Sequence, residues 1–397
     1  MSSLQSTKPG RPAPSHGFDA AEFASRTDRA QALMSDHALD ALLVTTPQNV
    51  RYFTGFDSQF WESPTRPWFV LVPRSGRPVA IIPEIGAPAM ARSWVEDIRT
   101  WPAPVPDDDG ISLLAAAIAD LPKRFGRVGM ELGREMSLRM PVTDFLALRD
   151  RVGTELTDGS PCLWDIRMVK TPAEIARIDH ICAIASDAYG ALPGWAGPGM
   201  TDRQVSARLR QDILARGADN VPFLPAISGP GGIDQIVCGP GDRELTLGDV
   251  LFIDTGSTFD GYFCDFDRQY AVGQPADAVA RAHETLWQAT EAGLQAARPG
   301  ALTDDLYHAM ARILEEAGAP GGNVGRLGHG LGLQLTEPPS HRPGDGTTLT
   351  QGMVLTIEPG MEYAPGKMLV HEENIVLTAD GAELLTTRAP RELPVLS

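Results

Sequence analysis

Five side chains of metal-binding type constrain the fold of this chain most, because they are scattered along the sequence and must meet in space to act together. They lie in segments whose patterns indicate strand, strand, glycine-rich turn, strand and strand: Asp254, Asp265, His329, Glu358 and Glu373. Four carboxylates and one imidazole exceed the needs of one ordinary zinc site. They suit two divalent cations about 3.5–4 Å apart, because carboxylate oxygens can bridge two ions and offset their repulsion. Such a pair can generate a hydroxide nucleophile at neutral pH and polarise a carbonyl group.

The first two candidate ligands are joined by a predicted hairpin. Asp254 ends an apolar strand in GDVLFIDTGSTFDGYFCDFDR, and Asp265 follows eleven residues later, after Gly256 and Gly261. A turn in this glycine-containing stretch brings the two carboxylates together. An Asp after a strand is usually a turn residue when taken alone. The recurrence of ligand-type residues in further segments favours a metal site.

The other three candidates lie in later segments of the chain. His329 lies among glycines in GRLGHGLGLQ, where the backbone can approach a metal or substrate closely. Glu358 ends the apolar strand of GMVLTIEPG, just before a Pro-Gly turn. In MLVHEENIVLT, Glu372 and Glu373 interrupt a strand, and side-chain alternation directs only one of them toward the site.

Length, charge and cysteine usage limit the class of protein. A chain of 397 residues predicts two domains. The net charge of −17 makes a nucleic acid or an anionic membrane surface an unfavourable partner. No apolar run approaches the roughly 18 residues of a membrane-spanning helix. The four cysteines form no CxxC pair, so we expect no disulfide scaffold or thiolate zinc site, and a reducing cytoplasm fits best.

The first half of the chain has the pattern of an α/β layer. Residues 1–17 contain Pro, Ser and Gly without an apolar segment, which predicts a flexible tail or an arm that packs on a partner subunit. Residues 18–163 alternate short apolar strands (ALLVTTP, WFVLVP, VAIIP, GRVGMEL) with helical segments (AMARSWVED, MPVTDFLALRDRV). This alternation is typical of a domain in which helices cover a sheet.

A second domain is predicted from residue 164 to residue 397. Thr171 as N-cap, Pro172 at the first helical position and Glu174 three residues after the cap form a capping box that opens a long helix. Strands and helices then follow in pairs, with helices expected at TDRQVSARLRQDILARGA, AVARAHETLWQATEAGLQAA and TDDLYHAMARILEEAG. The chain closes with the strands of MVLTIEPG and EENIVLT.

The order Asp, eleven residues, Asp, then GHG, IEPG and a final Glu before a strand resembles a known superfamily. It is similar to the creatinase, prolidase, aminopeptidase P and methionine aminopeptidase superfamily (M24-type), which has the pita-bread fold. NVRYFTGF also resembles the N-x-x-Y-x-T-G pattern of the creatinase-type N-terminal domain. The resemblance covers the whole chain. It implies an α/β (α+β) protein with a creatinase-type N-terminal domain followed by a pita-bread catalytic domain.

The resemblance also implies the roles of the ligands. Asp254 and Asp265 would bind one metal ion, His329 would bind the other, and Glu358 and Glu373 would complete both. Glu373 is preferred to Glu372 because the final ligand of the family precedes an acidic or amide residue and a strand, as Asn374 follows here. Glu358 would also act as the general base toward the bridging water. The metals implied are two divalent ions of manganese, iron, cobalt or zinc.

Two histidines that accompany these ligands in the peptidases of the superfamily are absent. The upstream position falls near Ile236 or Val237, and the position seven residues after His329 is Thr336. Both losses weaken the expectation of an ordinary proline-specific peptidase, and the first also counts against a strict creatinase. The replacement groups that remain available are Thr336, Glu337, Asp267, His341 and His371. We expect catalytic roles for Thr336 and for His371, which precedes Glu373 by two residues and so shares its strand face.

An aromatic loop in the first domain offers a substrate-binding candidate. The segment FDSQFWESPTRPWFVLVP concentrates Phe60, Trp61 and Arg66 in a short connection. The alternative is a loop packed on its own domain. In creatinase-like relatives the corresponding loop enters the partner subunit's pocket, where aromatic rings hold a cationic group and arginine holds a carboxylate. This resemblance implies a homodimer and a small amphoteric substrate.

Three functions remain as hypotheses. The leading one is a dinuclear metal hydrolase of the Xaa-Pro dipeptidase or aminopeptidase P type, which cleaves a C–N amide bond in a dipeptide-like or small N-acyl substrate. The second is a small-molecule hydrolase or lyase of the creatinase, ectoine hydrolase and dimethylsulfoniopropionate lyase branch, although Gly256 stands where such lyases carry an acidic residue. The third is a catalytically inactive binding protein, which the retention of all five ligands disfavours.

Overall fold

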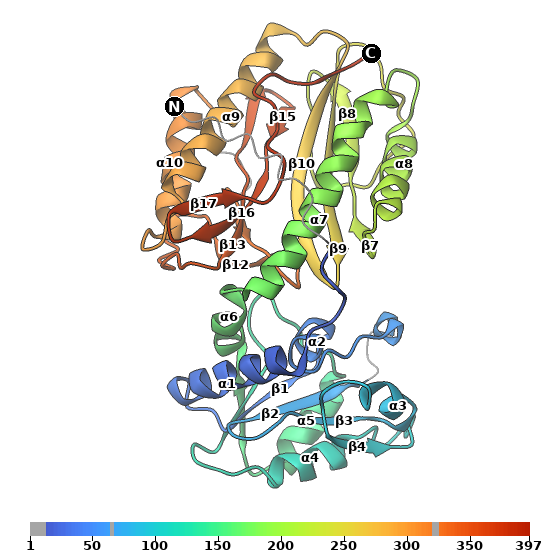
Figure 1. The fold of residues 1–397 in the computed structure, drawn as a ribbon, viewed down its shortest axis with the longest axis vertical. Coiled ribbons are helices and arrows are strands. Elements are labelled where there is room, and N and C mark those ends of the chain that lie inside the picture. The colour runs from blue at the N-terminus through green and yellow to red at the C-terminus, as the bar shows by residue number, and fades with distance from the viewer. Residues whose placement is uncertain (1–12, 64–66, 320–324) are drawn as a thin grey trace. The chain divides into compact units, whose positions relative to one another are not determined.

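The chain forms two compact units in a computed structural model that describes residues 13–63, 67–319 and 325–397 (Figure 1). One unit comprises residues 16–167, and the other comprises residues 168–397 with the short segment before residue 16. The boundary expected between residues 163 and 164 falls inside helix α6 (Ser160–Met168). Residues 1–12, most of the expected tail, lie outside the described residues.

The unit of residues 16–167 is built on a six-stranded sheet in the order β4-β3-β2-β1-β5-β6. The central strand β1 pairs antiparallel with β2 and parallel with β5. The expected α/β layer is therefore present. Its strands are β1 (Ala41–Val44), β2 (Phe69–Pro73), β3 (Val79–Pro83), β4 (Asp97–Trp101), β5 (Arg127–Met130) and β6 (Glu155–Asp158). Its longer helices are α1 (Ala20–Asp36), α2 (Pro47–Thr54), α4 (Ile111–Ala119) and α5 (Val142–Arg151).

The prediction of a helix at AMARSWVED is wrong for most of that segment. Helix α3 spans only Ala87–Met90, and the chain then turns. The Ser93 hydroxyl accepts a hydrogen bond from the Val95 N–H at 3.3 Å, and the Trp94 indole donates to the Phe53 carbonyl at 2.7 Å. Such side-chain bonds offer the backbone an alternative to the helical pattern and so end the helix early.

The second unit opens with a long antiparallel hairpin. Strands β9 (Asp249–Phe259) and β10 (Tyr262–Val272) are joined by Asp260 and Gly261, whose φ angles are 50° and 80°. Two central residues with positive φ form the turn whose twist matches that of the flanking strands, and Asp-Gly suits it. The predicted hairpin is thus present. It belongs to a sheet completed by β7 (Asn220–Phe223), β8 (Ala226–Pro230) and β18 (Val395–Leu396).

A second sheet of this unit has the order β12-β11-β13-β16-β17. Its pairings are antiparallel throughout the described strands. A separate two-stranded hairpin, β14-β15, lies between β13 and β16 in sequence. The strands are β11 (His329–Gly330), β12 (Glu337–Ser340), β13 (Val354–Ile357), β14 (Gly360–Ala364), β15 (Lys367–Val370), β16 (Glu373–Thr378) and β17 (Gly381–Leu384).

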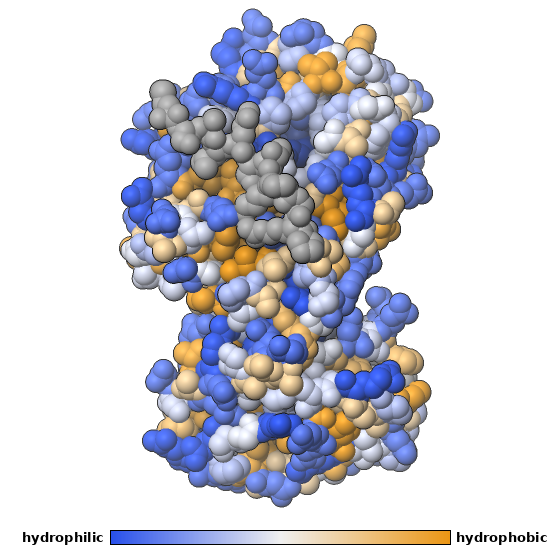
Figure 2. Space-filling model, in the orientation of Figure 1, coloured by the Kyte–Doolittle hydropathy of each residue, from blue (hydrophilic) through white to orange (hydrophobic). Residues whose placement is uncertain are grey.

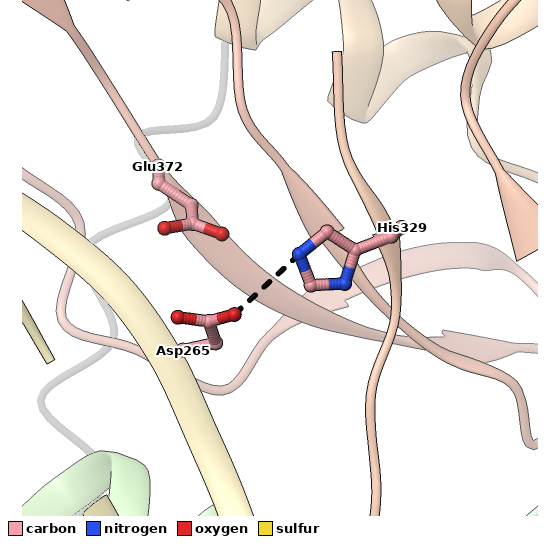
Figure 3. Close-up of side chains that lie close together, drawn as sticks. All are labelled: Asp265, His329 and Glu372. Carbon is pink, nitrogen blue, oxygen red and sulfur yellow. Dashed lines mark ion pairs between the residues drawn. The ribbon is translucent and has the colours of Figure 1, made fainter. Parts of the chain in front are cut away.

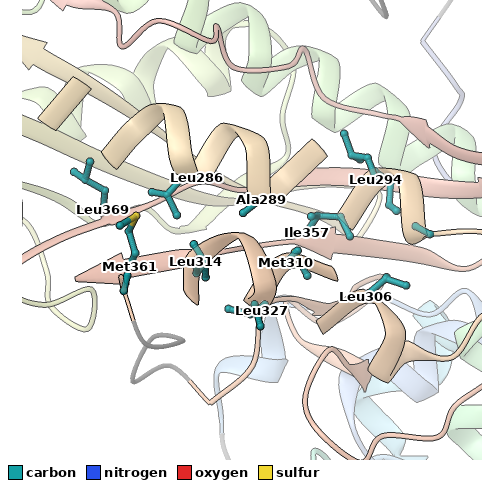
Figure 4. Close-up of a cluster of buried hydrophobic side chains, with 14 of the residues drawn as sticks. Leu286, Ala289, Leu294, Leu306, Met310, Leu314, Leu327, Ile357, Met361 and Leu369 are labelled. Carbon is teal, nitrogen blue, oxygen red and sulfur yellow. The ribbon is translucent and has the colours of Figure 1, made fainter. Parts of the chain in front are cut away.

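Two pairs of helices cover these sheets. Helices α7 (Pro172–Ala191) and α8 (Asp202–Ala215) lie beside the β9–β10 sheet, and α9 (Asp277–Ala296) and α10 (Thr303–Glu316) lie beside the other (Figure 1). Figure 4 shows the apolar core that α9 and α10 form with the strands, in which Leu286, Met310 and Ile357 are fully buried. Burial of such side chains contributes about 1.5–3 kcal/mol each. Both sheets are therefore backed by tightly packed helices.

The predicted capping box at the start of α7 is confirmed. The Thr171 hydroxyl accepts from the Glu174 N–H at 3.3 Å, and the Glu174 carboxylate accepts from the Thr171 N–H at 2.9 Å. The same carboxylate accepts from the Tyr262 hydroxyl at 2.9 Å, which ties α7 to the first residue of β10. The cap therefore orients the helix against the hairpin.

The visible face of each unit is mostly hydrophilic, with apolar side chains in smaller groups (Figure 2). This surface agrees with the charged composition of the chain. Within the described residues, none of the helices combines the length and the apolar character required to span a bilayer.

We expect Thr171→Ala to lower the stability of the second unit by about 1 kcal/mol, because the cap loses its side-chain acceptor. The thermal unfolding midpoint should fall by roughly 2–4 °C. Thr171→Ser keeps the hydroxyl and is the matched control. Equal losses in the two variants would show that the cap hydrogen bond does not matter.

Candidate metal centre

Three carboxylates lie on one face of the β9–β10 hairpin. In the ladder, Asp267 is opposite Asp254, and Asp265 is opposite Gly256. Directly opposite side chains of an antiparallel pair point to the same face, as do side chains two residues apart on one strand. The hairpin therefore gathers Asp254, Asp265 and Asp267.

His329 reaches this group from β11 with one ring nitrogen available. Its Nδ1 lies 2.8 Å from the Gly330 carbonyl, which can only accept, so Nδ1 carries the proton. Nε2 then has a free lone pair and lies 3.4 Å from Asp265 Oδ2. Burial above all, followed by the charge of Arg326, lowers the pKa of His329 to about 3. The imidazole is therefore neutral, the form that binds a metal ion.

The second sheet contributes two glutamates. Glu358 directly follows β13, and its Oε2 lies 3.9 Å from His329 Nε2. Glu372 directly precedes β16, and one of its oxygens lies within 4.8 Å of ligand atoms of both Asp265 and His329 (Figure 3). The three residues drawn in Figure 3 are all buried. This spacing is compatible with a common metal ion.

The electrostatics of the group favour a bound cation. Burial raises the pKa of Asp254 to about 7, and burial together with repulsion from Asp254 raises that of Glu358 to about 8. Burial and neighbouring carboxylates also raise the pKa of Asp265 and Glu372. Asp254 Oδ1 and Glu372 Oε1 are buried without a hydrogen-bond partner among the described residues. Such orphaned, mutually repelling oxygens fit the requirements of hard divalent ions.

The structure corrects the choice between the two adjacent glutamates: Glu372, not Glu373, lies beside Asp265 and His329. The Glu373 carboxylate points to the other face, where it accepts hydrogen bonds from Arg268 Nη2 at 2.9 Å, the Ala389 N–H at 2.7 Å and the Thr386 hydroxyl. The next residue, Asn374, points back to the site side, because its amide bonds the backbone N–H and C=O of Asp265. Alternation along the strand accounts for both orientations.

The catalytic role expected for His371 conflicts with its orientation for the same reason. His371 does share the face of Glu373, with its Nε2 4.0 Å from Glu373 Oε1. That face points away from Asp265 and His329. The other ring nitrogen, Nδ1, lies 2.9 Å from the Thr290 hydroxyl of α9.

Thr336 lies at the metal-ligand cavity, which has a volume of about 430 Å³. Asp254, Asp265, His329 and Glu358 line the same cavity. At the position of the absent upstream histidine, Ile236 and Val237 supply an apolar wall.

Arg326 also lines the cavity and was missed by the sequence reasoning. Its Nη2 donates to the Thr336 hydroxyl at 3.3 Å. Its positive charge opposes the effect of burial on the pKa of Asp265 and of Glu358. The one available signal was its position three residues before His329 in the glycine-rich segment.

The remaining replacement candidates have other partners. Glu337 forms a buried ion pair with Lys170 at 3.1 Å. His341 Nε2 lies 2.9 Å from the Thr356 carbonyl, and burial chiefly lowers its pKa to about 4. Neither lines the metal-ligand cavity as the structure describes it.

The aromatic loop belongs to the other unit and is described by itself. Trp61 lies in a short helix, Gln59–Glu62, where its ring packs near Phe56 and Trp68 and under the guanidinium of Arg139 at 4.8 Å. The Phe60 side chain is exposed at 49%. Arg66 lies outside the described residues. Trp61 is thus packed within its own unit.

We expect Glu372→Gln to weaken metal binding roughly tenfold or more, because it removes a charged ligand oxygen. Glu373→Gln should retain the metal but lower stability, since it weakens the buried pair with Arg268, and complete loss of one partner of such a pair costs about 3–5 kcal/mol. Metal content after dialysis and the thermal midpoint measure the two effects. Loss of metal in Glu373→Gln alone would reverse the assignment.

The raised pKa values predict that the folding stability of the metal-free protein depends on pH. Asp254 and Glu358 titrate near 7 and 8 in the fold but near 4 when unfolded, so folding favours their protonated forms. Their contribution to stability is complete below about pH 4 and is lost as the pH rises toward 8. We expect Mn²⁺ to raise the thermal midpoint more at pH 8 than at pH 5.5, because protons compete with the metal. An equal rise at both pH values would contradict this linkage.

Comparisons with known proteins agree with this geometry. Residues 176–380 match the model of metallopeptidase family M24, and residues 26–169 match the creatinase/prolidase N-terminal domain. The chain is 30% identical over 387 residues to the probable dipeptidase PepE of Mycobacterium tuberculosis, covering 96% of this chain and 99% of that protein. It is 32% identical over 232 residues to the Xaa-Pro dipeptidase of Pyrococcus furiosus, covering 58% of this chain and 66% of that protein.

Solved structures show the same similarity. The dipeptidase PepE from Mycobacterium ulcerans superposes with a TM-score of 0.84 at 30% identity, covering 96% of this chain and 99% of that one. The prolidase from Thermococcus sibiricus also gives a TM-score of 0.84, at 26% identity, covering 96% of this chain and 100% of that one. The expected creatinase-type domain and pita-bread domain are confirmed. This chain is a hydrolase that belongs to metallopeptidase family M24 and carries a creatinase/prolidase N-terminal domain.

Proposed function

We propose that this enzyme is a metal-dependent dipeptidase that hydrolyses the C–N amide bond of a small dipeptide. The observation that carries the proposal is a single cavity lined by Asp254, Asp265, His329 and Glu358 together with the cation Arg326. The relatives named dipeptidase and Xaa-Pro dipeptidase support the same reaction class. Removal of the metal with EDTA should abolish dipeptide hydrolysis, and added Mn²⁺ should restore it.

The proposed metal ligands differ at one position from those expected from the sequence. Asp254, Asp265, His329, Glu358 and Glu372 hold two divalent ions, with Glu372 in place of Glu373. Manganese, iron, cobalt or zinc suit four carboxylates and one imidazole, and manganese best matches the excess of hard oxygen donors. When bound, such ions lower the pKa of a water molecule and polarise the scissile carbonyl.

Glu358 is the proposed general base. Its side chain is 19% exposed, compared with 7% for Asp265, so it is the more accessible to an incoming water. It accepts the proton of the attacking water and returns it to the leaving amine. The elevated pKa of about 8 reflects burial and repulsion from Asp254, and a nearby cation lowers it.

Arg326 and Thr336 are the proposed substrate-binding pair. Among the described residues that line the cavity, Arg326 is the one permanent cation. Its guanidinium pairs with the free carboxylate of a dipeptide, and the Thr336 hydroxyl, which it already contacts, adds a hydrogen bond. Thr336 is a poor proton donor near neutral pH, so its catalytic role is to position the substrate. Apolar side chains complete the wall: Phe223, Ile236, Val237, Phe252, Leu335 and Val370.

The lyase version of the alternative function has a structural argument against it. Lyases of this fold are expected to carry an acidic residue at the position of Gly256. A Cβ atom there would lie 2.4 Å from Leu335 Cδ1 and 3.1 Å from Phe223 Cβ. A side chain at this position would have to displace Leu335, which counts against an additional ligand there.

The proposal also includes a cytoplasmic homodimer. Phe60, which is 49% exposed, would contact the substrate site of the partner subunit. The free cysteines Cys162, Cys182, Cys238 and Cys264 suit a reducing compartment. The small amphoteric substrate suits an enclosed site of this kind.

We expect Arg326→Gln to raise the KM for dipeptides about 10–150-fold, because a hydrogen bond to a charged group contributes about 1.5–3 kcal/mol. Hydrolysis of the corresponding dipeptide amides, which lack the carboxylate, should change little. Arg342→Gln removes an exposed arginine that does not line the cavity and is the matched control. Comparable losses on dipeptides and amides would rule out carboxylate recognition by Arg326.

A further inference from the structure

A second cavity of about 270 Å³ lies within the same unit, on the strand face to which His371 points. Its walls come from α7, β10, α9 and the segment of residues 387–394. Gly190 of α7 lines it and is exposed to solvent. Among the described residues, none lines both this cavity and the metal-ligand cavity.

Two imidazoles present bare acceptor nitrogens at this cavity. The Thr290 hydroxyl donates its one proton to the Leu286 carbonyl at 3.0 Å, so His371 Nδ1 must donate to Thr290 at 2.9 Å. His283 Nε2 lies 3.1 Å from the Pro390 carbonyl and must likewise carry the proton. His371 Nε2 and His283 Nδ1 are then unprotonated. Both are buried and have no partner among the described residues.

Further polar atoms at the same cavity also lack partners. Both amide atoms of Gln269 and the Nε–H of Arg388 are buried and unpaired within the described part of the chain. The rest of the Arg388 guanidinium is engaged, because it lies 3.8 Å over the Trp287 ring and pairs with Glu291. An unsatisfied buried polar group costs about 1–3 kcal/mol, and native proteins contain few of them. Their concentration in four residues around one cavity (His371, His283, Gln269 and Arg388) favours a polar ligand.

The chemistry of these atoms selects an amphoteric ligand. His371 Nε2, His283 Nδ1 and Gln269 Oε1 require hydrogen-bond donors, whereas Arg388 Nε and Gln269 Nε2 require acceptors. An ammonium group satisfies the first set, and a carboxylate satisfies the second. The charge of Arg268, which also lines the cavity, is balanced by Glu373 at 2.9 Å. Most of the remaining wall is apolar, with Tyr189, Pro193, Ala389, Pro390 and Pro394, and Ser186 and Thr387 add two hydroxyl residues.

We propose that this cavity is a second binding site, distinct from the metal centre, for a free amino acid with a small apolar side chain. The volume lies just below the range of about 300–1,000 Å³ that is typical of drug-sized ligands, which suits a molecule of this size. His371 directly precedes the metal ligand candidate Glu372, so occupancy orders the backbone that carries that carboxylate. The inference does not depend on the proposed dipeptidase reaction, because binding is measured directly.

The test is calorimetric titration of the manganese-loaded enzyme with L-proline, L-leucine and trimethylglycine. We expect one saturable site for an amino acid and at least tenfold weaker binding of trimethylglycine, which keeps both charges but has no N–H donor. Absence of saturable binding by both amino acids, or equal binding of trimethylglycine, overturns the proposal.

Variants locate the binding event. Gly190→Leu should weaken it at least tenfold, because a Cβ at Gly190 meets no atom within 4 Å and the side chain can enter the cavity without disturbing α7. His371→Leu removes an acceptor and should have a similar effect. Ala183→Leu, exposed on the same helix but outside the cavity, and Arg326→Gln, at the metal centre, should retain binding. Binding that survives Gly190→Leu but is lost in Arg326→Gln belongs to the metal centre and refutes the second site.

Discussion

Repulsion between buried carboxylates is the constraint on which the second unit depends. Asp254, Asp265, Asp267, Glu358 and Glu372 share an interior where charge is poorly solvated, and burial raises the pKa of each of them. Such groups stay close only when the surrounding packing holds them and when protons or a cation reduce their mutual repulsion. The helices behind both sheets supply the packing. Divalent ions convert the remaining repulsion into binding free energy.

One side-chain amide links the two sheets directly. Asn374 of β16 bonds both the N–H and the C=O of Asp265 on β10, as a neighbouring strand would. This contact fixes Glu372 opposite the hairpin carboxylates and leaves Glu373 to neutralise Arg268 on the other side. Two adjacent glutamates therefore have different tasks: one offers a bare carboxylate to the metal centre, and the other has its charge satisfied within the protein.

Sequence patterns predicted the secondary-structure elements better than the directions in which individual side chains point. The capping box at Thr171, the β9–β10 hairpin and the α/β layer follow from local rules that the structure obeys. The choice of Glu373 failed because alternation says that one of two neighbours faces the site but does not say which, and a slip of one residue reverses every side chain. The expectation for His371 failed with it, because His371 was chosen for sharing the strand face of Glu373. Arg326 could not be predicted, because its glycine-rich segment has no periodicity from which a side-chain direction can be inferred.

The buried ion pair between Lys170 and Glu337 connects the N-terminal start of the second unit with the wall of the metal-ligand cavity. Lys170 directly precedes the α7 cap, and Glu337 directly follows Thr336. Each side chain is 2% exposed or less, so neither charge can be lost without stranding the other. Evolutionary change at these two positions must therefore be coordinated. Relatives that exchange one of them should exchange the other as well.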